Sequence, residues 1–562
     1  MNTAPVSVPV TFLTTVALAL PATAQTDPGD PDVCGDTKLI AREAARYDYF
    51  GHSVSLSGET ALIGAPSDNT YSGADPGAIH FFDRSAAGWV ETDRLTAGGT
   101  EPNTQFGFAV SLYGGTAMAG APRDRDGGYH AGAVHVFERE ASGWVATAKL
   151  TAVLPRDGAD FGWSVSLFGD RALVGSPGDD YVTGGALGSV RVFERTPSGW
   201  FETQKLSASD GEPGRLFGWS VSLSGDTAFV GAPHYTYGAV YVFELTPTGW
   251  VETQKLVNGA PDVNDFGSAV SLSGGEALVG AYSGYGTAHV YERRPTGWLW
   301  VSQLGVADRA PGDRFGWSLS LWGGYALVGA WQRSTYWRGP GKAYLFERTE
   351  FGWRQMLKLT AGDGEDFEQF GYSVSLSEGT VLVGAPHDDD EGPWSGSAYV
   401  YQIPAADFAA SYCFGVGCPC GNDDAKAGCA NSSGGGALLT ACGSESVAAD
   451  DLLLTASGLP TNKWGLFYMG AAQLDMPFGD GQRCVGSGGV GMFRFFPLQN
   501  SGPLGTLVLG PGIAAHASAS FPGAGHIDPG DTWSFQTWYR DPAGPCRFGF
   551  NLSSAVAVTF AP

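Results

Sequence analysis

One segment of about fifty residues recurs seven times along the chain, and this repetition restricts the fold more than any other feature. Each copy has the pattern Phe-Gly-x-(Ser/Ala)-(Val/Leu)-Ser-Leu, then a tight polar turn, then a run such as Ala-Leu-Val-Gly-Ala-Pro, as in FGWSVSLSGDTAFVGAP at 217–233. Two further apolar runs complete the unit. The copies begin at Phe50, Phe106, Phe161, Phe217, Phe266, Phe315 and Phe370.

Every part of this unit has the sequence pattern of a β-strand. SVSLS alternates apolar and polar residues, as a half-buried strand does. ALVGAP and AVYVFE are rich in strand-forming residues and are bounded by Gly and Pro. Four short strands at this period predict a propeller with one sheet per blade, because stacked sheets bury faces that a single sheet cannot. Residues 36–403 are therefore predicted to form an all-β, seven-bladed β-propeller.

The ends of the repeat array predict how the ring closes. Repeats one to six end with a Gly-Trp strand, whereas the seventh stops at 397–401 without one. The segment DTKLIA at 36–41 is similar to TQKLSA at 203–208. We expect it to supply the outer strand of blade seven and leave no open edge. The regular Gly-Trp residues are predicted to be core, as are Trp163, Trp219 and Trp317 after Phe-Gly.

The Phe-Gly opening and Gly-Ala-Pro close resemble the FG-GAP repeat of the integrin α-subunit β-propeller family over residues 36–403. The resemblance implies seven blades and a role in adhesion or binding. That family holds calcium in an Asp-rich turn between the first two strands. Here the turn is Ser-Gly-Asp-Thr or similar, which lacks the six to eight oxygens that calcium needs, so no cofactor is expected. Asp388, Asp389 and Asp390 form a weak calcium candidate, but a solvated loop is the preferred interpretation.

Charge and the N-terminal segment indicate where the protein works. The net charge of −25 argues against nucleic acid and against anionic membrane surfaces. Residues 1–24 contain a short apolar run followed by Ala22-Thr23-Ala24, which is typical of a cleaved signal peptide. We therefore predict a secreted or cell-surface protein with no membrane insertion after signal cleavage.

Residues 411–562 leave the repeat pattern and carry most of the cysteines. Short strands with Gly-rich turns predict a small β-sandwich. The segments CPCGN, PFGDGQRCVG and FQTWYRDP resemble a C-terminal domain common in secreted proteins of planctomycete-type bacteria, which implies an exterior location but does not indicate a function. Eight cysteines in an exported chain predict disulfides rather than a zinc site, and a Cys34–Cys413 pair near the propeller seam is one hypothesis. They are Cys34, Cys413, Cys418, Cys420, Cys429, Cys442, Cys484 and Cys546.

The loops on one face of the predicted propeller are rich in aromatic residues. Aromatic side chains on variable loops over a rigid scaffold suit recognition of an extracellular protein or glycan; packing over the blade rims is the alternative. The sequence has no His-Glu-x-x-His, Gly-x-Ser-x-Gly or phosphate-loop motif. It therefore predicts a non-catalytic binding or adhesion protein, with a polysaccharide-active enzyme or a structural envelope protein as alternatives. The candidate ligand-binding residues are Tyr71, Tyr129, Tyr181, Tyr235, Tyr237, Tyr285, Trp331, Trp337 and Trp394.

Overall fold

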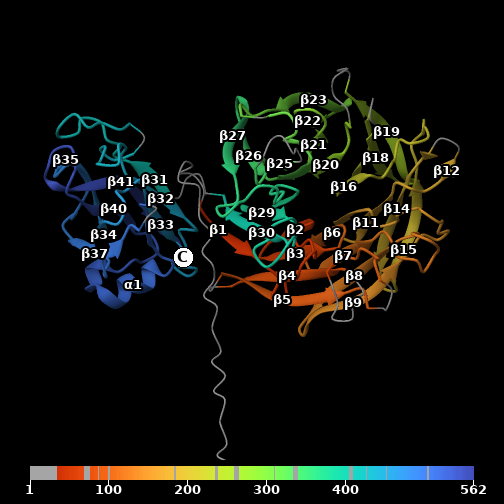
Figure 1. The fold of residues 1–562 in the computed structure, drawn as a ribbon, viewed down its shortest axis with the longest axis horizontal. Coiled ribbons are helices and arrows are strands. Elements are labelled where there is room, and N and C mark those ends of the chain that lie inside the picture. Colours follow the sequence, from red (N-terminus) through yellow and green to blue (C-terminus); the bar gives the residue numbers. More distant parts are fainter. Residues whose placement is uncertain are drawn as a thin grey trace, which may run out of the picture.

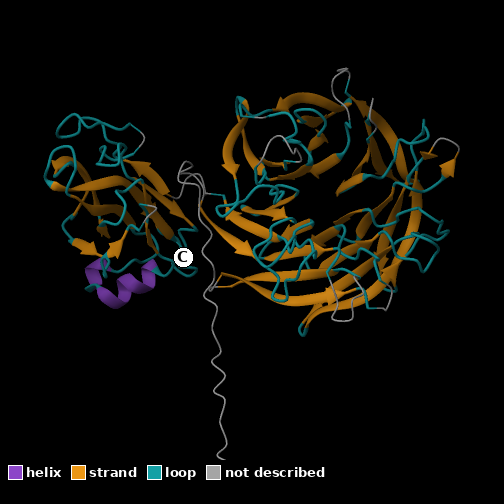
Figure 2. Ribbon diagram, in the orientation of Figure 1, coloured by secondary structure: helices purple, strands orange, loops and turns teal. Residues whose placement is uncertain are grey.

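In the described part of the computed structural model, nearly all of the regular secondary structure is β-strand, and loops and turns connect the strands (Figure 2). A ring of sheets occupies β1 to β30, and a separate β-rich part occupies β31 to β41 (Figure 1). The structure describes residues 34–68, 76–85, 88–98, 102–182, 185–233, 238–258, 265–308, 310–332, 339–403, 409–425, 427–450, 452–502 and 505–562. The predicted signal peptide at 1–24 lies outside these residues.

Seven four-stranded antiparallel sheets form the blades, which confirms the predicted propeller. A short extra hairpin, β12 Tyr181–Val182 and β13 Gly185–Ala186, projects from blade three. From the axis outwards, the first six blades are β2 Ser53–Ser57, β3 Thr60–Ala65, β4 Ala78–Ser85, β5 Gly88–Thr96; β6 Val110–Tyr113, β7 Thr116–Ala121, β8 Ala133–Glu140, β9 Gly143–Leu150; β10 Ser164–Phe168, β11 Arg171–Ser176, β14 Ser189–Thr196, β15 Gly199–Leu206; β16 Ser220–Ser224, β17 Thr227–Ala232, β18 Ala239–Thr246, β19 Gly249–Val257; β20 Ala269–Ser273, β21 Glu276–Ala281, β22 Thr287–Arg294, β23 Gly297–Leu304; and β24 Ser318–Trp322, β25 Tyr325–Ala330, β26 Lys342–Thr349, β27 Gly352–Leu359.

Blade seven combines the two ends of the repeat array. It contains β28 Ser373–Ser377, β29 Thr380–Ala385, β30 Ser397–Gln402 and, outermost, β1 Cys34–Leu39. β1 runs antiparallel to β30, with Lys38 opposite Tyr399. The predicted closure by the N-terminal segment is therefore confirmed, and it pairs the edge that blade seven would otherwise expose.

The Phe-Gly pair forms the middle of a tight turn in every blade. The amide of the residue after Phe-Gly donates to the carbonyl of the residue before it, as Trp219 does to Leu216 at 3.1 Å. The glycine adopts a φ between 87° and 92° in all seven turns. A type II turn requires this left-handed conformation at its third position, where a side chain would be strained. The recurring glycine is thus explained by backbone geometry.

The same glycine packs against the Gly-Ala-Pro glycine of the preceding blade. A Cβ built on Gly231 would lie 2.0 Å from the carbonyl oxygen of Gly267 in the next blade. The equivalent distance is 2.0 or 2.1 Å at all seven blade interfaces, including that between Gly384 and Gly51 across the seam. The Phe-Gly glycine of one blade and the Gly-Ala-Pro glycine of the preceding blade therefore form one close backbone contact between the blades.

A closed circle of hydrogen bonds joins the seven innermost strands. In each blade, the serine that ends the (Ser/Ala)-(Val/Leu)-Ser pattern accepts a hydrogen bond from a leucine amide of the next blade, at 2.9–3.0 Å. The circle closes where Ser375 accepts from Leu56. Each bond satisfies an amide that its own sheet leaves unpaired. The accepting residues are Ser55, Ser111, Ser166, Ser222, Ser271, Ser320 and Ser375.

The tryptophan of each Gly-Trp strand packs into the space between blades. Trp144, Trp250 and Trp298 are buried, and Trp144 stacks on Phe81 of the preceding blade at 4.2 Å between ring centroids. The other three, Trp89, Trp200 and Trp353, are half-buried against neighbouring core clusters. The prediction that these residues belong to the core is confirmed for Trp144, Trp250 and Trp298, whereas the other three are only partly buried against the core clusters.

The C-terminal part has two packed layers. One layer is a six-stranded sheet, and the other combines a three-stranded sheet with the helix α1 Ile513–Ser520; a one-turn 3₁₀ helix, Gly523–Gly525, follows it. A hairpin covers part of the other face of the six-stranded sheet. The strands are β31 Ala409–Tyr412, β34 Trp464–Gly470, β37 Met492–Arg494, β38 Gln499–Asn500, β40 Thr532–Asp541 and β41 Gly549–Thr559 in the first sheet; β32 Leu438–Cys442, β33 Leu453–Ser457 and β39 Leu507–Leu509 in the second; and β35 Ala472–Phe478 with β36 Gly481–Gly486 in the hairpin.

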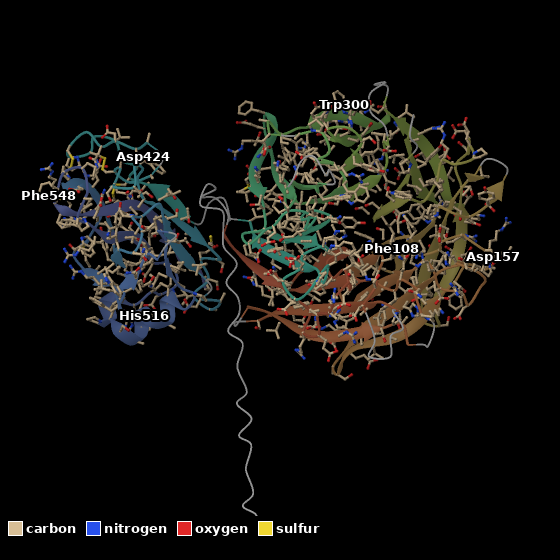
Figure 3. All side chains as sticks on the ribbon, in the orientation of Figure 1. Phe108, Asp157, Trp300, Asp424, His516 and Phe548 are labelled. Atoms are coloured by element: carbon tan, nitrogen blue, oxygen red, sulfur yellow. A yellow bond between two sulfur atoms is a disulfide. The ribbon has the colours of Figure 1, made fainter. Side chains whose placement is uncertain are left out.

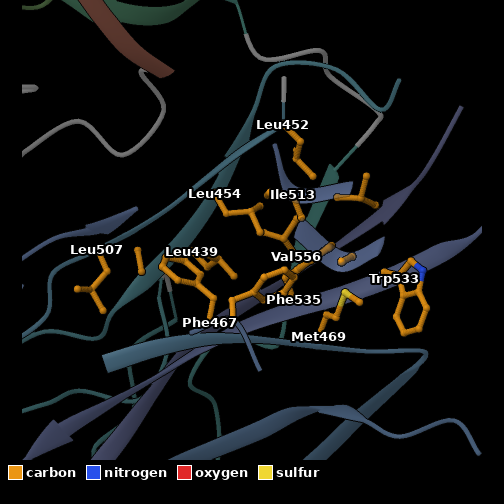
Figure 4. Close-up of a cluster of buried hydrophobic side chains, with 14 of the residues drawn as sticks. Leu439, Leu452, Leu454, Phe467, Met469, Leu507, Ile513, Trp533, Phe535 and Val556 are labelled. Atoms are coloured by element: carbon orange, nitrogen blue, oxygen red, sulfur yellow. The ribbon is translucent and has the colours of Figure 1, made fainter. Parts of the chain in front are cut away.

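The core between these layers includes side chains of α1, a helix that the sequence did not predict (Figure 4). Ile513 packs with Leu454, Phe467 and Phe535 in this buried cluster. The carboxylate of Asp450 accepts hydrogen bonds from the first amides of α1, at 2.7 and 2.8 Å. Because a capping group normally lies next to a helix start in sequence, this distant cap left no local signal.

The cysteine pairs correct one prediction. Cys413 bonds to Cys484, with their Cα atoms 6.0 Å apart, so the proposed Cys34–Cys413 pair is wrong. The end of β31 and the hairpin strand β36 bring these two residues together within the C-terminal part. Cys418 pairs with Cys429, Cys420 pairs with Cys546, and Cys442 is also disulfide-bonded. No free thiol and no metal-binding cluster of His, Cys, Asp or Glu occurs among the described residues.

A search of the described residues for helices finds none that is both long and apolar enough to cross a membrane.

Candidate functional site on the top face of the propeller

The face that carries the Phe-Gly turns, here named the top face, displays a ring of aromatic side chains around the propeller axis. The residues directly after Phe-Gly form this axial ring, and Phe108 lies nearer the middle of the propeller than Trp300 or Asp157 in Figure 3. Five of the seven consecutive pairs are in contact, with centroid separations of 4.7–5.5 Å. Its members are His52, Phe108, Trp163, Trp219, Ser268, Trp317 and Tyr372.

Turn geometry places these side chains. Each member is the fourth residue of a Phe-Gly turn, directly before an innermost strand, and the seven innermost strands contact each other in a closed circle. The residue before each Phe also adopts a left-handed φ, between 51° and 63°, although none of the seven is glycine. Such a conformation persists only where surrounding contacts fix it. The ring is therefore a consequence of seven rigid turns.

The ring is interrupted at blade five, where Ser268 replaces an aromatic residue. Tyr282, from the following loop, packs edge-on against Trp317 at 4.8 Å near this interruption. The guanidinium of Arg314 lies 5.1 Å from the centroid of Tyr282 and 4.6 Å from that of Trp331. One sector of the ring thus already holds a cation against aromatic faces.

The titratable members of the ring are uncharged near neutral pH. Burial lowers the pKa of His52 to about 4, although its Nδ1 lies 3.1 Å from the carbonyl oxygen of Phe108. Burial likewise raises the pKa of Tyr372 to about 12. The ring therefore offers half-buried, neutral π faces, which can contact apolar groups, sugar faces or cations.

Sequence reasoning missed this ring. Trp163, Trp219 and Trp317 do contact neighbouring blades, as predicted, but they are half-buried at the axis rather than part of the closed core. The signal was present, because the position after Phe-Gly is aromatic or His in six of seven repeats. What the sequence does not show is that these positions converge on one axis.

The loop aromatics predicted as ligand contacts are scattered over the top face. Tyr129, Tyr181, Tyr285 and Trp394 have exposed fractions between 43% and 75%. Trp331 is only 5% exposed and packs on Trp317 and Tyr372 behind the ring. Their role in binding stays a prediction. Four other candidates lie outside the described residues: Tyr71, Tyr235, Tyr237 and Trp337.

The acidic loop proposed as a weak calcium candidate surrounds a lysine. The Nζ atom of Lys38 lies 2.8 Å from Asp388, 2.8 Å from Asp363 and 2.5 Å from Asp390. The side chains of Lys38 and Asp388 are each only 3% exposed. Burial opposes the charged form of Lys38, but hydrogen bonds with the three carboxylates outweigh it and raise the pKa of the ammonium group. The ammonium group of Lys38 therefore occupies the centre of this cluster.

Comparable ion pairs tie the loops of other blades to their outer strands. In each of these blades, one residue separates the aspartate from the preceding Gly-Ala-Pro or Gly-Ser-Pro. The Lys or Arg side chain that pairs with it comes from the fourth strand of the same blade. The pairs are Asp68 with Arg94, Asp124 with Lys149 and Asp179 with Lys205, at 2.6–3.0 Å. These contacts hold the top-face loops in place around the axial ring.

Glu368, beside the Lys38 cluster, is expected to make stability depend on pH. It is 5% exposed, and burial raises the pKa of its carboxyl to about 8. Asp388 and Asp363 raise this pKa further, whereas Lys38 and the Glu365 amide lower it. Between about pH 4.5 and 8, the carboxyl of Glu368 is therefore protonated in the folded state and ionised in the unfolded state. Its contribution to the free energy of unfolding is complete below pH 4.5 and is lost as the pH rises towards 8.

Glu368→Gln is expected to remove this dependence. The variant should exceed the parent in free energy of unfolding by roughly 1–3 kcal/mol at pH 8.5 and by less at pH 5. Urea denaturation at both values measures this difference, with Glu365→Gln, an exposed neighbour, as the control. Parallel pH profiles for parent and variant would contradict the assignment.

No curated protein matches the chain. Among solved structures, one described as "Crystal Structure of Mitotic Checkpoint Complex" has 11% identity and a TM-score of 0.43, covering 70% of this chain and 99% of that one. A protein from Lactobacillus plantarum has 15% identity and a TM-score of 0.40, covering 61% of this chain and 96% of that one.

A family model described as "FG-GAP repeat" matches residues 36–82, 89–137, 144–193, 200–243, 298–346 and 353–401. These segments amount to more than half of the chain, and each extends from an outer strand into the Phe-Gly and Gly-Ala-Pro strands of the next blade. The chain therefore belongs to the FG-GAP repeat family.

Proposed function

We propose that this chain is an exported, non-catalytic binding or adhesion protein that recognises an extracellular protein or glycan through its axial ring. The nearly continuous circle of half-buried aromatic side chains is the observation that carries this proposal. Its resemblance to integrin α-subunits favours adhesion. The disulfides, and the likeness of residues 411–562 to domains of secreted bacterial proteins, favour an exterior location.

The ring is suited to binding because it is rigid before a partner arrives. The hydrogen-bonded circle of serines and the seven turns fix its members, so little conformational entropy is lost on binding. Aromatic rings supply a large contact area with few rotatable bonds. Tyr129, Tyr285 and Trp394 extend the contact surface outwards over the same face.

The double substitution Trp163→Ala/Trp219→Ala is expected to weaken binding by at least tenfold, because it removes two adjacent members of the ring. The measurement is binding of the protein to an array of glycans and extracellular proteins, followed by titration of the strongest partner. Phe351→Ala is the matched control, since Phe351 is 93% exposed at a turn on the opposite face. Circular dichroism and thermal unfolding establish that both variants fold.

Three results would overturn the proposal. Binding that survives the double substitution in a folded protein would place the contact elsewhere. Sugar release by the parent would favour the polysaccharide-active enzyme, and no binding together with abundance in the cell envelope would favour the structural protein.

A further inference from the structure

A small pocket lies in the C-terminal part, on the face of the six-stranded sheet that is turned away from the core of Figure 4. Its volume is about 280 Å³. It is bordered by the sheet on one side and by the β35–β36 hairpin on the other. The lining residues are Leu466, Tyr468, Phe478, Arg483, Met492, Arg494, Trp538 and Leu552.

Successive side chains of one strand face the core and this pocket in turn. In β34, Phe467 and Met469 enter the core cluster, whereas Leu466 and Tyr468 face the pocket. This is the period of two expected of a strand whose two faces are both covered. Leu466 lies opposite Trp538, and Tyr468 lies opposite Arg494, so neighbouring strands contribute side chains at the same level.

The hairpin that borders the pocket is firmly held. Cys484 of β36 is bonded to Cys413, and its amide donates to the side-chain oxygen of Gln536 at 3.0 Å. The side-chain nitrogen of Gln536 donates to the carbonyl of Gln482 at 2.9 Å. Gln536 is fully buried in the sheet. The pocket wall is therefore in place without a ligand, as in most small-molecule sites.

The charge of the pocket differs from that of the whole chain. Residues 411–562 contain only six Lys or Arg side chains, and Arg483 and Arg494 both line this one pocket. None of the described residues that line it is acidic, although the chain has a net charge of −25.

Neither of these two arginines has a carboxylate partner in the described part of the chain. The Nε atom of Arg483 is buried without a hydrogen-bond acceptor, and its Nη2 reaches only the sulfur of Met476, at 3.2 Å. A buried guanidinium nitrogen without an acceptor is costly, because its lost hydration is not replaced.

We infer that this pocket binds a small ligand with an apolar body and a carboxylate head. Trp538, Leu466 and Met492 supply the apolar contacts, and the two guanidinium groups supply hydrogen bonds to the carboxylate. Arginine suits this task because its planar fork matches both carboxylate oxygens. The volume limits the body to about the size of a fused bicyclic ring. This site is independent of the axial ring.

The test uses naphthalene-2-carboxylate as the probe and naphthalene-2-carboxamide as its uncharged counterpart, titrated into the full chain by calorimetry. We expect saturable binding of the carboxylate, at least tenfold weaker binding of the carboxamide, and loss of that difference in Arg483→Gln/Arg494→Gln. Arg547→Gln, an exposed arginine outside the pocket, is the matched control.

Equal affinity for the two probes, no binding of either at millimolar concentration, or a charge preference retained in the double variant would each overturn the inference. The probe comparison in the parent protein needs no substitution, and Arg494→Gln alone alters an exposed side chain. The result is therefore decisive even if the double variant fails to fold.

Discussion

Gly231→Ala is expected to destabilise the propeller by about 3 kcal/mol or more. The new Cβ would lie 2.0 Å from the carbonyl oxygen of Gly267 and 2.2 Å from the Oγ atom of Ser220. The carbonyl belongs to the backbone of the next blade and cannot move without opening the interface. Chemical denaturation, followed by tryptophan fluorescence, measures the loss.

The control for this substitution is Gly305→Ala. A Cβ at Gly305 meets no atom within 4 Å, and neither glycine has a left-handed φ, so backbone strain does not distinguish the two variants. Gly305→Ala should change the free energy of unfolding by less than about 1 kcal/mol. Similar stability of the two variants would show that the interface between blades four and five can accommodate the added methyl group, which would contradict the close backbone contact between Gly231 and Gly267.

Lys38→Met is expected to destabilise the closed ring by about 3–5 kcal/mol, because it leaves the buried carboxylate of Asp388 without its cation. Lys38 lies on β1, the strand that completes blade seven, so its loss acts at the seam of the propeller. The hydroxyl of Tyr399 still donates to Asp388 at 2.9 Å but brings no positive charge. Thermal and urea unfolding at pH 7 measure the effect.

Lys255→Met is the matched control, since Lys255 occupies the same position in blade four. Its partner Asp210 lies 2.5 Å away, but their side chains are 34% and 54% exposed. A solvent-exposed pair of this kind contributes about 1 kcal/mol or less. Equal effects of the two substitutions would mean that the Lys38 cluster is a surface network and does not anchor the closing strand.

The architecture of the propeller could be predicted from the sequence because the patterns that specify its strands lie within short segments and recur in every copy. Strand alternation and Gly-bounded apolar runs appear in every copy, and seven copies in register leave a ring as the solution that buries both sheet faces. The likeness of 36–41 to 203–208 was enough to place the closing strand. Trp144, Trp250 and Trp298 were assigned to the core correctly because the register of the Gly-Trp residues never changes.

Contacts between distant residues could not be predicted in this way. The pairing of Cys413 with Cys484, the capping of α1 by Asp450 and the enclosure of Lys38 by Asp363 and Asp388 each join segments between 60 and about 350 residues apart. No local pattern encodes which of many cysteines or aspartates will meet. The correction of the Cys34–Cys413 hypothesis follows from this limit.

The sequence by itself determined the repeating unit, its strands and the number of blades, because strand periodicity is a property of neighbouring residues. Only the tertiary structure decided what the turns present together. The seven positions after Phe-Gly lie some fifty residues apart in the chain, and ring closure brings them to one axis, where five of the seven neighbouring pairs have ring centroids 4.7–5.5 Å apart. The axial ring is thus a property of the closed circle, not of any single repeat.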